Sequence, residues 1–274
     1  MSRRKTVSNV MAWIAIVLIT AFFFFPILWE FITSFKSSLE VISSKPTIFF
    51  KPSLENWTSI LERGILVNLK NSIIISIAST IFSVFVGALA AYSLATVNFK
   101  RRKMLSFEII MLRMIPPVAV VVPIFLLWQK VHLIDTYGGL IILYVTFNLP
   151  FSAWLLIQYF RGVPKEILEA ALVDGSSWSK NFWRIVLPLA KPGVVAVSIF
   201  CLIFSWSEFL FALILTDEKT FTLPVAASGV MRLHLMDWGA LSSACSLIMI
   251  LPLLFMFFMQ RHFVRGLTFG AMKE

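Results

Sequence analysis

Arg113 is a charged residue within a long apolar stretch of the sequence. It follows the basic cluster 100–103 by about ten residues, which at 1.5 Å per residue places it near the midplane of a membrane helix. A charge at that depth costs several kcal/mol, so the side chain should face water or protein. Pro116 and Pro117 follow and interrupt helical hydrogen bonding. Arg113 therefore either lines a polar path or pairs with an acidic group or a carbonyl at a subunit interface.

Trp206 and Glu208 lie in a second apolar stretch, 192–215. An indole face can stack on a sugar ring, and a carboxylate accepts hydrogen bonds from hydroxyl groups. The plainer interpretation places Trp206 in the aromatic belt of the membrane surface and Glu208 in water. Asn148, which precedes Pro150, is another polar candidate, for which hydrogen bonding between packed helices is the alternative.

The sequence lacks the residue patterns of other chemistries. It has no Gly-Lys-Ser/Thr phosphate loop, so ATP binding by that route is not expected. It has no paired carboxylates and no Ser/His/Asp set, its three His residues are far apart, and Cys201 and Cys245 lie in apolar runs. We therefore expect neither enzymatic activity nor a bound metal or cofactor in this chain.

The polar segment 161–191 predicts a helix-turn-helix. A short helix over 165–173 should begin after Pro164, and Gly175 suits the left-handed position that ends a helix. Ser176 or Ser177 can cap a second helix. Its apolar stripe would consist of Trp178, Phe182 and Ile185. The alternative is an amphipathic linker that rests on lipid headgroups.

A membrane scaffold must position these residues. Hydrophobic residues make up 59% of the 274 and charged residues 14%, against about 25% charged residues in soluble domains. We predict one all-α membrane domain over 1–274, and its apolar runs are long enough to cross a bilayer. Its six spans should lie at about 10–34, 71–99, 105–128, 137–160, 192–215 and 239–260. The first run lacks a cleavage site, so we expect a retained span rather than a signal peptide.

The distribution of charge and of small residues refines this scheme. The net charge of +10 comes from short clusters between apolar runs, which indicates topology rather than nucleic-acid binding. With the N-terminus inside, the inner segments hold most of the 24 Lys and Arg residues. Both termini and segment 161–191 should therefore be cytoplasmic, with lipid around the spans. Gly87, Ala91 and Ala95 form a small-residue stripe that favours close helix packing.

Segment 161–191 resembles the cytoplasmic EAA loop of the membrane subunits of ATP-binding-cassette (ABC) importers. Ser176 stands where the family commonly has Ala, and Ser207 stands where Asn is common in a similar Trp-x-Glu-Phe feature of the fifth span. Nearly the whole chain resembles the carbohydrate-uptake branch, notably the smaller six-span permease of maltose-type systems. The residues that match the loop are Glu169, Ala170, Ala171, Asp174, Gly175, Phe182, Ile185, Leu187 and Pro188.

The resemblance implies a type I ABC importer permease in a bacterial inner membrane, forming half of a path for a sugar or sugar-like solute. The implied partners are a second homologous permease, two ATPase subunits and an extracytoplasmic solute-binding protein. ATP and Mg would be bound by the ATPase subunits. Glu169 would bond to an ATPase surface, and Gly175 would permit the turn. Loop 216–238 is implied to reach into the binding protein.

Two other classes of protein remain open on the sequence. An ion-coupled secondary transporter would usually need more spans, internal repeats and an acidic relay deep in the membrane. A non-transporting structural subunit would need no polar path, and charge removal at Arg113 and Glu208 would then leave transport intact.

Overall fold

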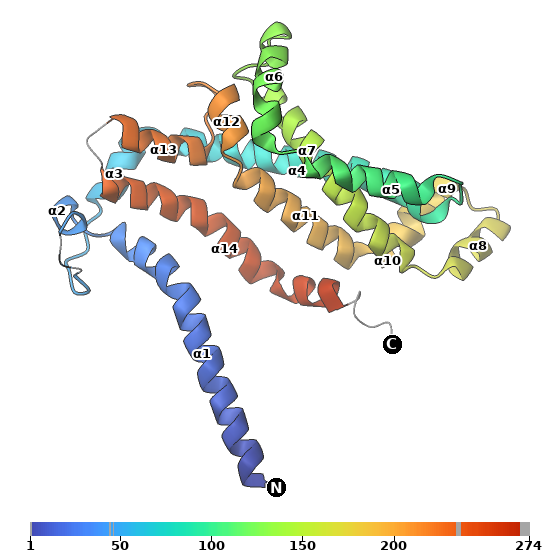
Figure 1. The fold of residues 1–274 in the computed structure, drawn as a ribbon, viewed down its shortest axis with the longest axis horizontal. Coiled ribbons are helices and arrows are strands. Elements are labelled where there is room, and N and C mark those ends of the chain that lie inside the picture. Colours follow the sequence, from blue (N-terminus) through green and yellow to red (C-terminus); the bar gives the residue numbers. More distant parts are fainter. Residues whose placement is uncertain (1, 44, 46, 234–236, 269–274) are drawn as a thin grey trace. The chain divides into compact units, whose positions relative to one another are not determined.

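The computed structural model describes residues 2–43, 45, 47–233 and 237–268, and these ranges form helices joined by turns (Figure 1). The all-α class that the sequence predicts is thereby confirmed. The chain divides into two compact units, Met1–Leu66 with Ala226–Ile250 and Val67–Val225 with Leu251–Glu274.

Four helical stretches of the described ranges are long and apolar enough to cross a membrane. They are Asn9–Thr33 within α1 (Ser2–Thr33), α4 (Ile65–Thr96), α7 (Tyr137–Arg161) and Trp238–Phe257 within α14 (Trp238–Thr268). Two bent helix pairs raise the number to six if each pair is one span. These pairs are Arg102–Met114 with Pro117–Lys130 and Trp178–Leu189 with Lys191–Trp206.

The first unit contains α1, α2 (Ser38–Val41) and α3 (Glu55–Glu62), together with parts of α13 (Leu223–Leu233) and α14. Asn56 on α3 is buried, and its Nδ2 donates to the carbonyl oxygens of Ser34 (3.2 Å) and Lys36 (2.7 Å). A Cβ added at Gly239 would collide with the same amide group. Asn56 thus holds the segment after α1 in place by hydrogen bonds and packs closely against Gly239 of α14.

Two prolines divide the predicted third span, 105–128. α5 (Arg102–Met111) continues as the 3-10 helix η1 (Leu112–Met114), and the backbone is extended at Ile115 and Pro116 before α6 (Pro117–Lys130) begins. Neither proline has an N–H group with which to continue the preceding helix. Pro117 is instead the first residue of α6, a position at which a proline loses no hydrogen bond. The two parts are bent by 85°.

The predicted fifth span, 192–215, is also divided. α11 (Lys191–Trp206) ends before Ser207, and α12 (Leu210–Leu215) begins after Phe209. The carboxylate of Glu208 accepts hydrogen bonds from the backbone N–H groups of Phe211 (2.9 Å) and Ala212 (3.1 Å). Glu208 therefore satisfies donors in the first turn of α12 that have no partner within the helix.

Segment 161–191, which we call the EAA loop, folds as four short helices. They are α8 (Lys165–Val173), α9 (Trp178–Asn181), the π-helix η2 (Phe182–Val186) and α10 (Leu187–Leu189). The sequence predicts the helix over 165–173 with these bounds, and Ser177 caps α9 by accepting from the N–H of Lys180 (3.3 Å).

Gly175 makes the turn between α8 and α9, with φ at +79°. Its N–H bonds to the carbonyl of Leu172 (3.1 Å), and the N–H of Ser176 bonds to that of Ala171 (2.9 Å). This pair of bonds is a Schellman motif, which uses a left-handed residue to satisfy the carbonyls at a helix end. The structure confirms the conformation that the sequence predicts for Gly175.

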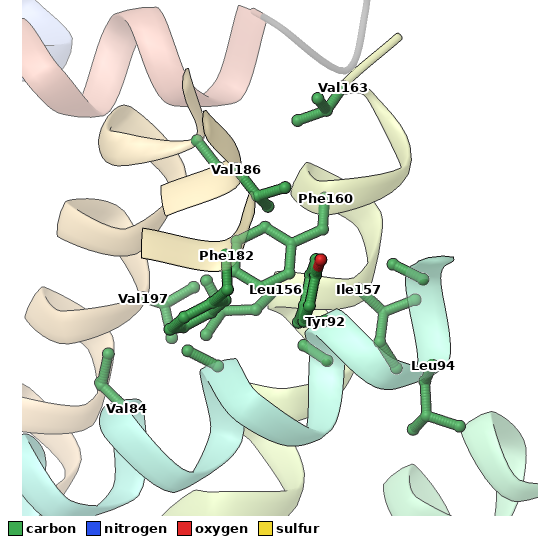
Figure 2. Close-up of a cluster of buried hydrophobic side chains, with 14 of the residues drawn as sticks. Val84, Tyr92, Leu94, Leu156, Ile157, Phe160, Val163, Phe182, Val186 and Val197 are labelled. Atoms are coloured by element: carbon green, nitrogen blue, oxygen red, sulfur yellow. The ribbon is translucent and has the colours of Figure 1, made fainter. Parts of the chain in front are cut away.

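A buried hydrophobic cluster joins the EAA loop to α4, α7 and α11 (Figure 2). Phe182 of η2 is only 3% exposed and packs with Phe160 of α7 and Tyr92 of α4. The Tyr92 hydroxyl also donates to the carbonyl of Trp178 (3.0 Å). Burying one such aromatic side chain contributes about 1.5–3 kcal/mol, so the loop is held firmly against the membrane helices.

The small-residue stripe of α4 packs closely, as the sequence predicts. Ala91 and Ala95 are buried, and a Cβ at Gly87 would collide with the hydroxyl of Ser152 on α7. That hydroxyl donates to the carbonyl of Ser83 (2.7 Å). Close approach and an interhelical hydrogen bond together fix α4 against α7.

Candidate functional site

A chain of polar contacts, which we call the polar bridge, consists of Arg113, Asn148, Ser205 and Ser79. Nη1 of Arg113 donates to the carbonyl of Phe147 (2.9 Å) and to Oδ1 of Asn148 (3.4 Å). The buried Asn148 donates through Nδ2 to the hydroxyl of Ser205 (2.8 Å), which also accepts from the hydroxyl of Ser79 (2.9 Å). The polar bridge links η1, α7, α11 and α4.

Aromatic rings surround the charge of Arg113. Its Cζ atom lies 4.3 Å from the ring centroid of Phe204 and 5.1 Å from that of Phe151, distances typical of cation–π contacts. No acidic side chain among the residues that the structure describes forms an ion pair with Arg113. The guanidinium is thus held by neutral groups, including a carbonyl of its own chain.

A cavity of about 280 Å³ opens beside the polar bridge. Its polar lining comes from Arg113, Tyr144, Asn148, Ser205 and Glu208, and its aromatic lining includes Phe147, Phe204 and Phe211. The structure therefore brings together three of the four residues that the sequence proposes for a polar path. The fourth, Trp206, is 1% exposed and lies within the protein core.

Glu208 has little free hydrogen-bonding capacity in this cavity. Besides its two bonds to backbone N–H groups of α12, it accepts from the hydroxyl of Tyr144 (2.9 Å). The carboxylate therefore acts mainly as a helix cap and as a link between α7 and α12.

Sequence reasoning missed Tyr144 and Ser205 as cavity residues. A signal was present, because Tyr144, Asn148 and Ser152 recur at intervals of four residues and so share one face of a helix. All three are buried, which shows that this polar face of α7 points into the protein.

The EAA loop exposes charged residues of both signs together with apolar residues. Glu169, Ala170 and Asp174 are exposed, Ala171 is half-buried, and Gly175 lies at the exposed turn. Leu168, by contrast, is buried in the hydrophobic cluster that joins the loop to α4, α7 and α11. The loop also exposes apolar side chains, namely Ile167, Val173, Trp178 and Trp183. A surface of this kind is suited to docking against another protein.

A polar junction that the sequence did not predict holds residues 217–223. Oδ1 of Asp135, in the turn between α6 and α7, accepts from the N–H of Asp217 (3.0 Å) and from the N–H and hydroxyl of Thr220 (3.1 and 2.7 Å). Burial alone would raise the pKa of Asp135, but these hydrogen bonds outweigh it and lower the pKa below its ordinary value.

Two side chains of α4 hold the same segment. Nδ2 of Asn71 donates to the carbonyls of Lys219 (3.1 Å) and Phe221 (3.0 Å), and the hydroxyl of Ser72 accepts from the N–H of Leu223 (2.7 Å). The start of the predicted loop 216–238 is thus tied to the ends of α4 and α7, while residues 234–236 lie outside the described ranges.

Long apolar helices, a polar bridge between helices with an adjoining cavity and an exposed helix-turn-helix define this protein as a membrane permease. The chain belongs to the family described as binding-protein-dependent transport system inner membrane component, whose model matches residues 83–269. This match confirms the family that the EAA loop indicates.

Individual relatives extend the match to almost the whole chain. A probable ABC transporter permease protein of Sinorhizobium fredii is 38% identical over 92% of this chain and 91% of its own. The trehalose/maltose transport system permease protein of Thermococcus litoralis is 33% identical over 99% of both chains. The chain is therefore a permease of an ABC importer.

Structural comparison gives the same fold. The chain matches one from a bacterial ABC transporter involved in the import of the acidic polysaccharide alginate, with a TM-score of 0.79, 19% sequence identity, and coverage of 96% of this chain and 99% of that one. At this identity the likeness shows the ABC importer permease fold alone.

Proposed function

We propose that this chain forms half of the translocation path of a carbohydrate importer, and that a second homologous permease forms the other half. The observation that carries the proposal is the cavity beside the polar bridge, in a chain that also presents the EAA loop. Relatives named for trehalose/maltose and for diacetylchitobiose transport support a sugar as the solute. Arg113 and Asn148 line the path, while Glu208 and Trp206 shape the helices around it.

ATP hydrolysis supplies the energy and takes place in two partner ATPase subunits, which bind ATP and Mg. The EAA loop docks on one of them through Glu169, Ala170 and Asp174. Phe182, which is buried, and Ala171, which is half-buried, pack beneath the exposed surface of the loop. Because the loop packs on α4, α7 and α11 through one buried cluster, a movement of the ATPase is transmitted as a rigid-body movement of these helices.

The proposed orientation follows the distribution of basic residues. Both termini and the EAA loop lie in the cytoplasm, and loop 216–238 lies outside, where an extracytoplasmic solute-binding protein delivers the sugar. The polar junction at Asp135 and Asn71 would hold the start of that loop in place while the binding protein docks.

Affinity purification of the mildly solubilised chain from its native membrane, with the co-purifying subunits identified, tests this function. We expect an ATPase and a second permease, and we expect Glu169→Lys to reduce the recovery of the ATPase at least tenfold, which corresponds to about 1.4 kcal/mol of binding free energy. Glu166→Lys is the matched control, since Glu166 is exposed on the same helix but outside the EAA match.

A chain that purifies without any ATPase would contradict the proposal. The same would hold if Glu169→Lys and Glu166→Lys reduced ATPase recovery equally, because the docking would then depend only on the net charge of α8. An ion-coupled secondary transporter would become the leading alternative in the first case.

A further inference from the structure

The donors of Arg113 are only partly used. A guanidinium carries five N–H donors, and the hydrogen bonds of Arg113 within the described residues all come from Nη1. Nε and Nη2 therefore keep donors that no described residue accepts from, and the side chain lines the cavity. Such donors favour a ligand that supplies acceptor oxygens.

The other polar groups of the cavity are engaged with one another. Tyr144 donates to Glu208, which also accepts two backbone N–H groups, and Asn148 donates to Ser205. The charge of Arg113 lacks an ion-pair partner among the described residues, whereas the carboxylate of Glu208 is surrounded by donors. The free polar capacity of the cavity is thus a cationic donor.

We propose that the cavity is a subsite for the anionic end of a carboxylated sugar, and that Arg113 selects for the carboxylate. The proposal rests on the proposed function and narrows its substrate class. A guanidinium binds a carboxylate through two parallel hydrogen bonds, a geometry that a hydroxyl group cannot match. The rings of Phe147, Phe204 and Phe211 supply faces for the apolar side of the sugar.

The size of the cavity agrees with a subsite rather than a complete site. Its volume of about 280 Å³ lies at the lower end of ligand cavities, which span roughly 300–1,000 Å³. It can hold one end of an oligosaccharide, and the remaining rings would then contact the partner permease.

The test measures uptake by the complete transporter in proteoliposomes, with its binding protein outside and ATP on the side of the ATPase subunits. The two labelled probes are a neutral disaccharide and the same disaccharide with a terminal uronic acid. Because one binding protein serves every variant, its own selectivity cancels when the uronate-to-neutral uptake ratio is compared between variants. We expect Arg113→Gln to lower this ratio about tenfold or more, as the loss of a charge-assisted bond predicts.

Two further variants control for folding and for charge. Arg113→Lys keeps the charge without the planar fork and should retain part of the preference. Arg63→Gln removes an arginine of the first unit that is ion-paired to Asp237 at 2.9 Å, and it should leave the uptake ratio unchanged.

Several results would overturn the proposal. One such result is that Arg113→Gln reduces the uptake of both probes equally. Another is that the wild-type transporter takes up the neutral probe and not the uronate. Either would show that Arg113 does not select a carboxylate, while the importer function would stand. An anionic lipid that co-purifies with the wild type and is lost in Arg113→Gln, without a change in the uptake ratio, would assign the donors to lipid. Absence of ATP-dependent uptake of either probe would remove the proposed function and this proposal together.

Discussion

Arg113 shows how a charge is accommodated in an apolar helical segment. The break at Pro116 ends the helix just after Arg113, and the side chain reaches a carbonyl of α7, an amide and two aromatic rings. Leaving a buried polar group without a partner costs about 1–3 kcal/mol, and a half-buried one such as Arg113 costs less. Asn148 therefore has a structural role as well as a place in the cavity lining, because its removal would leave both Arg113 and Ser205 with one partner fewer.

Asp135 gives a prediction for pH dependence. Hydrogen bonds hold its pKa below the ordinary value of 3.8, so the charged carboxylate stabilises the fold at neutral pH. This contribution is present above pH 3.8 and is lost as the pH falls through the lower folded-state pKa. Asp135→Asn should therefore lower stability by about 0.5–1 kcal/mol at pH 7, a small value because the group is partly solvated.

Thermal unfolding of the purified protein at a series of pH values from 7 to 3 checks the prediction for Asp135. The difference between wild type and Asp135→Asn should shrink at the acid end of the series. Asp217→Asn is the control, because Asp217 contributes its backbone N–H to the junction. A difference that stays constant down to pH 3 would refute the role of the charge.

Among the structural elements, α4 and α7 form the frame that holds the cavity and the EAA loop. Gly87→Val would place a branched side chain against Ser152 and force the two helices apart. Overpacking of this kind costs about 1–3 kcal/mol. We expect a lower unfolding temperature in detergent and reduced transport.

Gly138→Val is the matched control for Gly87→Val, since nothing lies within 4 Å of a Cβ at Gly138. Unfolding temperatures measured side by side should fall only for Gly87→Val. Equal unfolding temperatures for the two variants would mean that α4 and α7 do not depend on close contact at this position.

The sequence predicts those elements whose cause is local. The helix over 165–173, the left-handed Gly175, the cap at Ser177 and the small-residue stripe all follow from residue type and spacing, and the structure contains them. The polar junction at Asp135 was not predictable in this way, because it joins residues 82 and 85 positions apart in the chain.

Other elements depend on tertiary packing. The division of 192–215 arises from the hydrogen bonds of Glu208, and the π-helix η2 has no simple sequence signal. The buried Asn181, immediately before η2, has neither side-chain atom bonded within the described residues. A buried amide without hydrogen-bond partners is rare in folded proteins. It lies here beside a π-helical turn, a feature that often occurs at functional sites.

At the scale of the whole molecule, the proposed function of the chain is to couple an ATPase to the translocation path. The cavity and the EAA loop lie in one compact unit, and both contact α7 and α11. In the proposed function, an ATPase that moves the EAA loop would also move α7 and α11, which line the cavity. Transport then depends on a coupling free energy between two sites, for which about 1–3 kcal/mol is typical.

The most direct measurement of this coupling is ATP hydrolysis and sugar uptake, recorded together in proteoliposomes that contain the complete transporter with Gly175→Val. A branched side chain at a φ of +79° costs about 1–2 kcal/mol and distorts the turn between α8 and α9. Gly64→Val is the control, since Gly64 has a φ of +78° in a turn outside the EAA loop.

We predict that Gly175→Val lowers the sugar taken up per ATP hydrolysed about tenfold, whereas Gly64→Val leaves this ratio at the wild-type value. An unchanged ratio in Gly175→Val would contradict the claim that the EAA loop couples the ATPase to the translocation path.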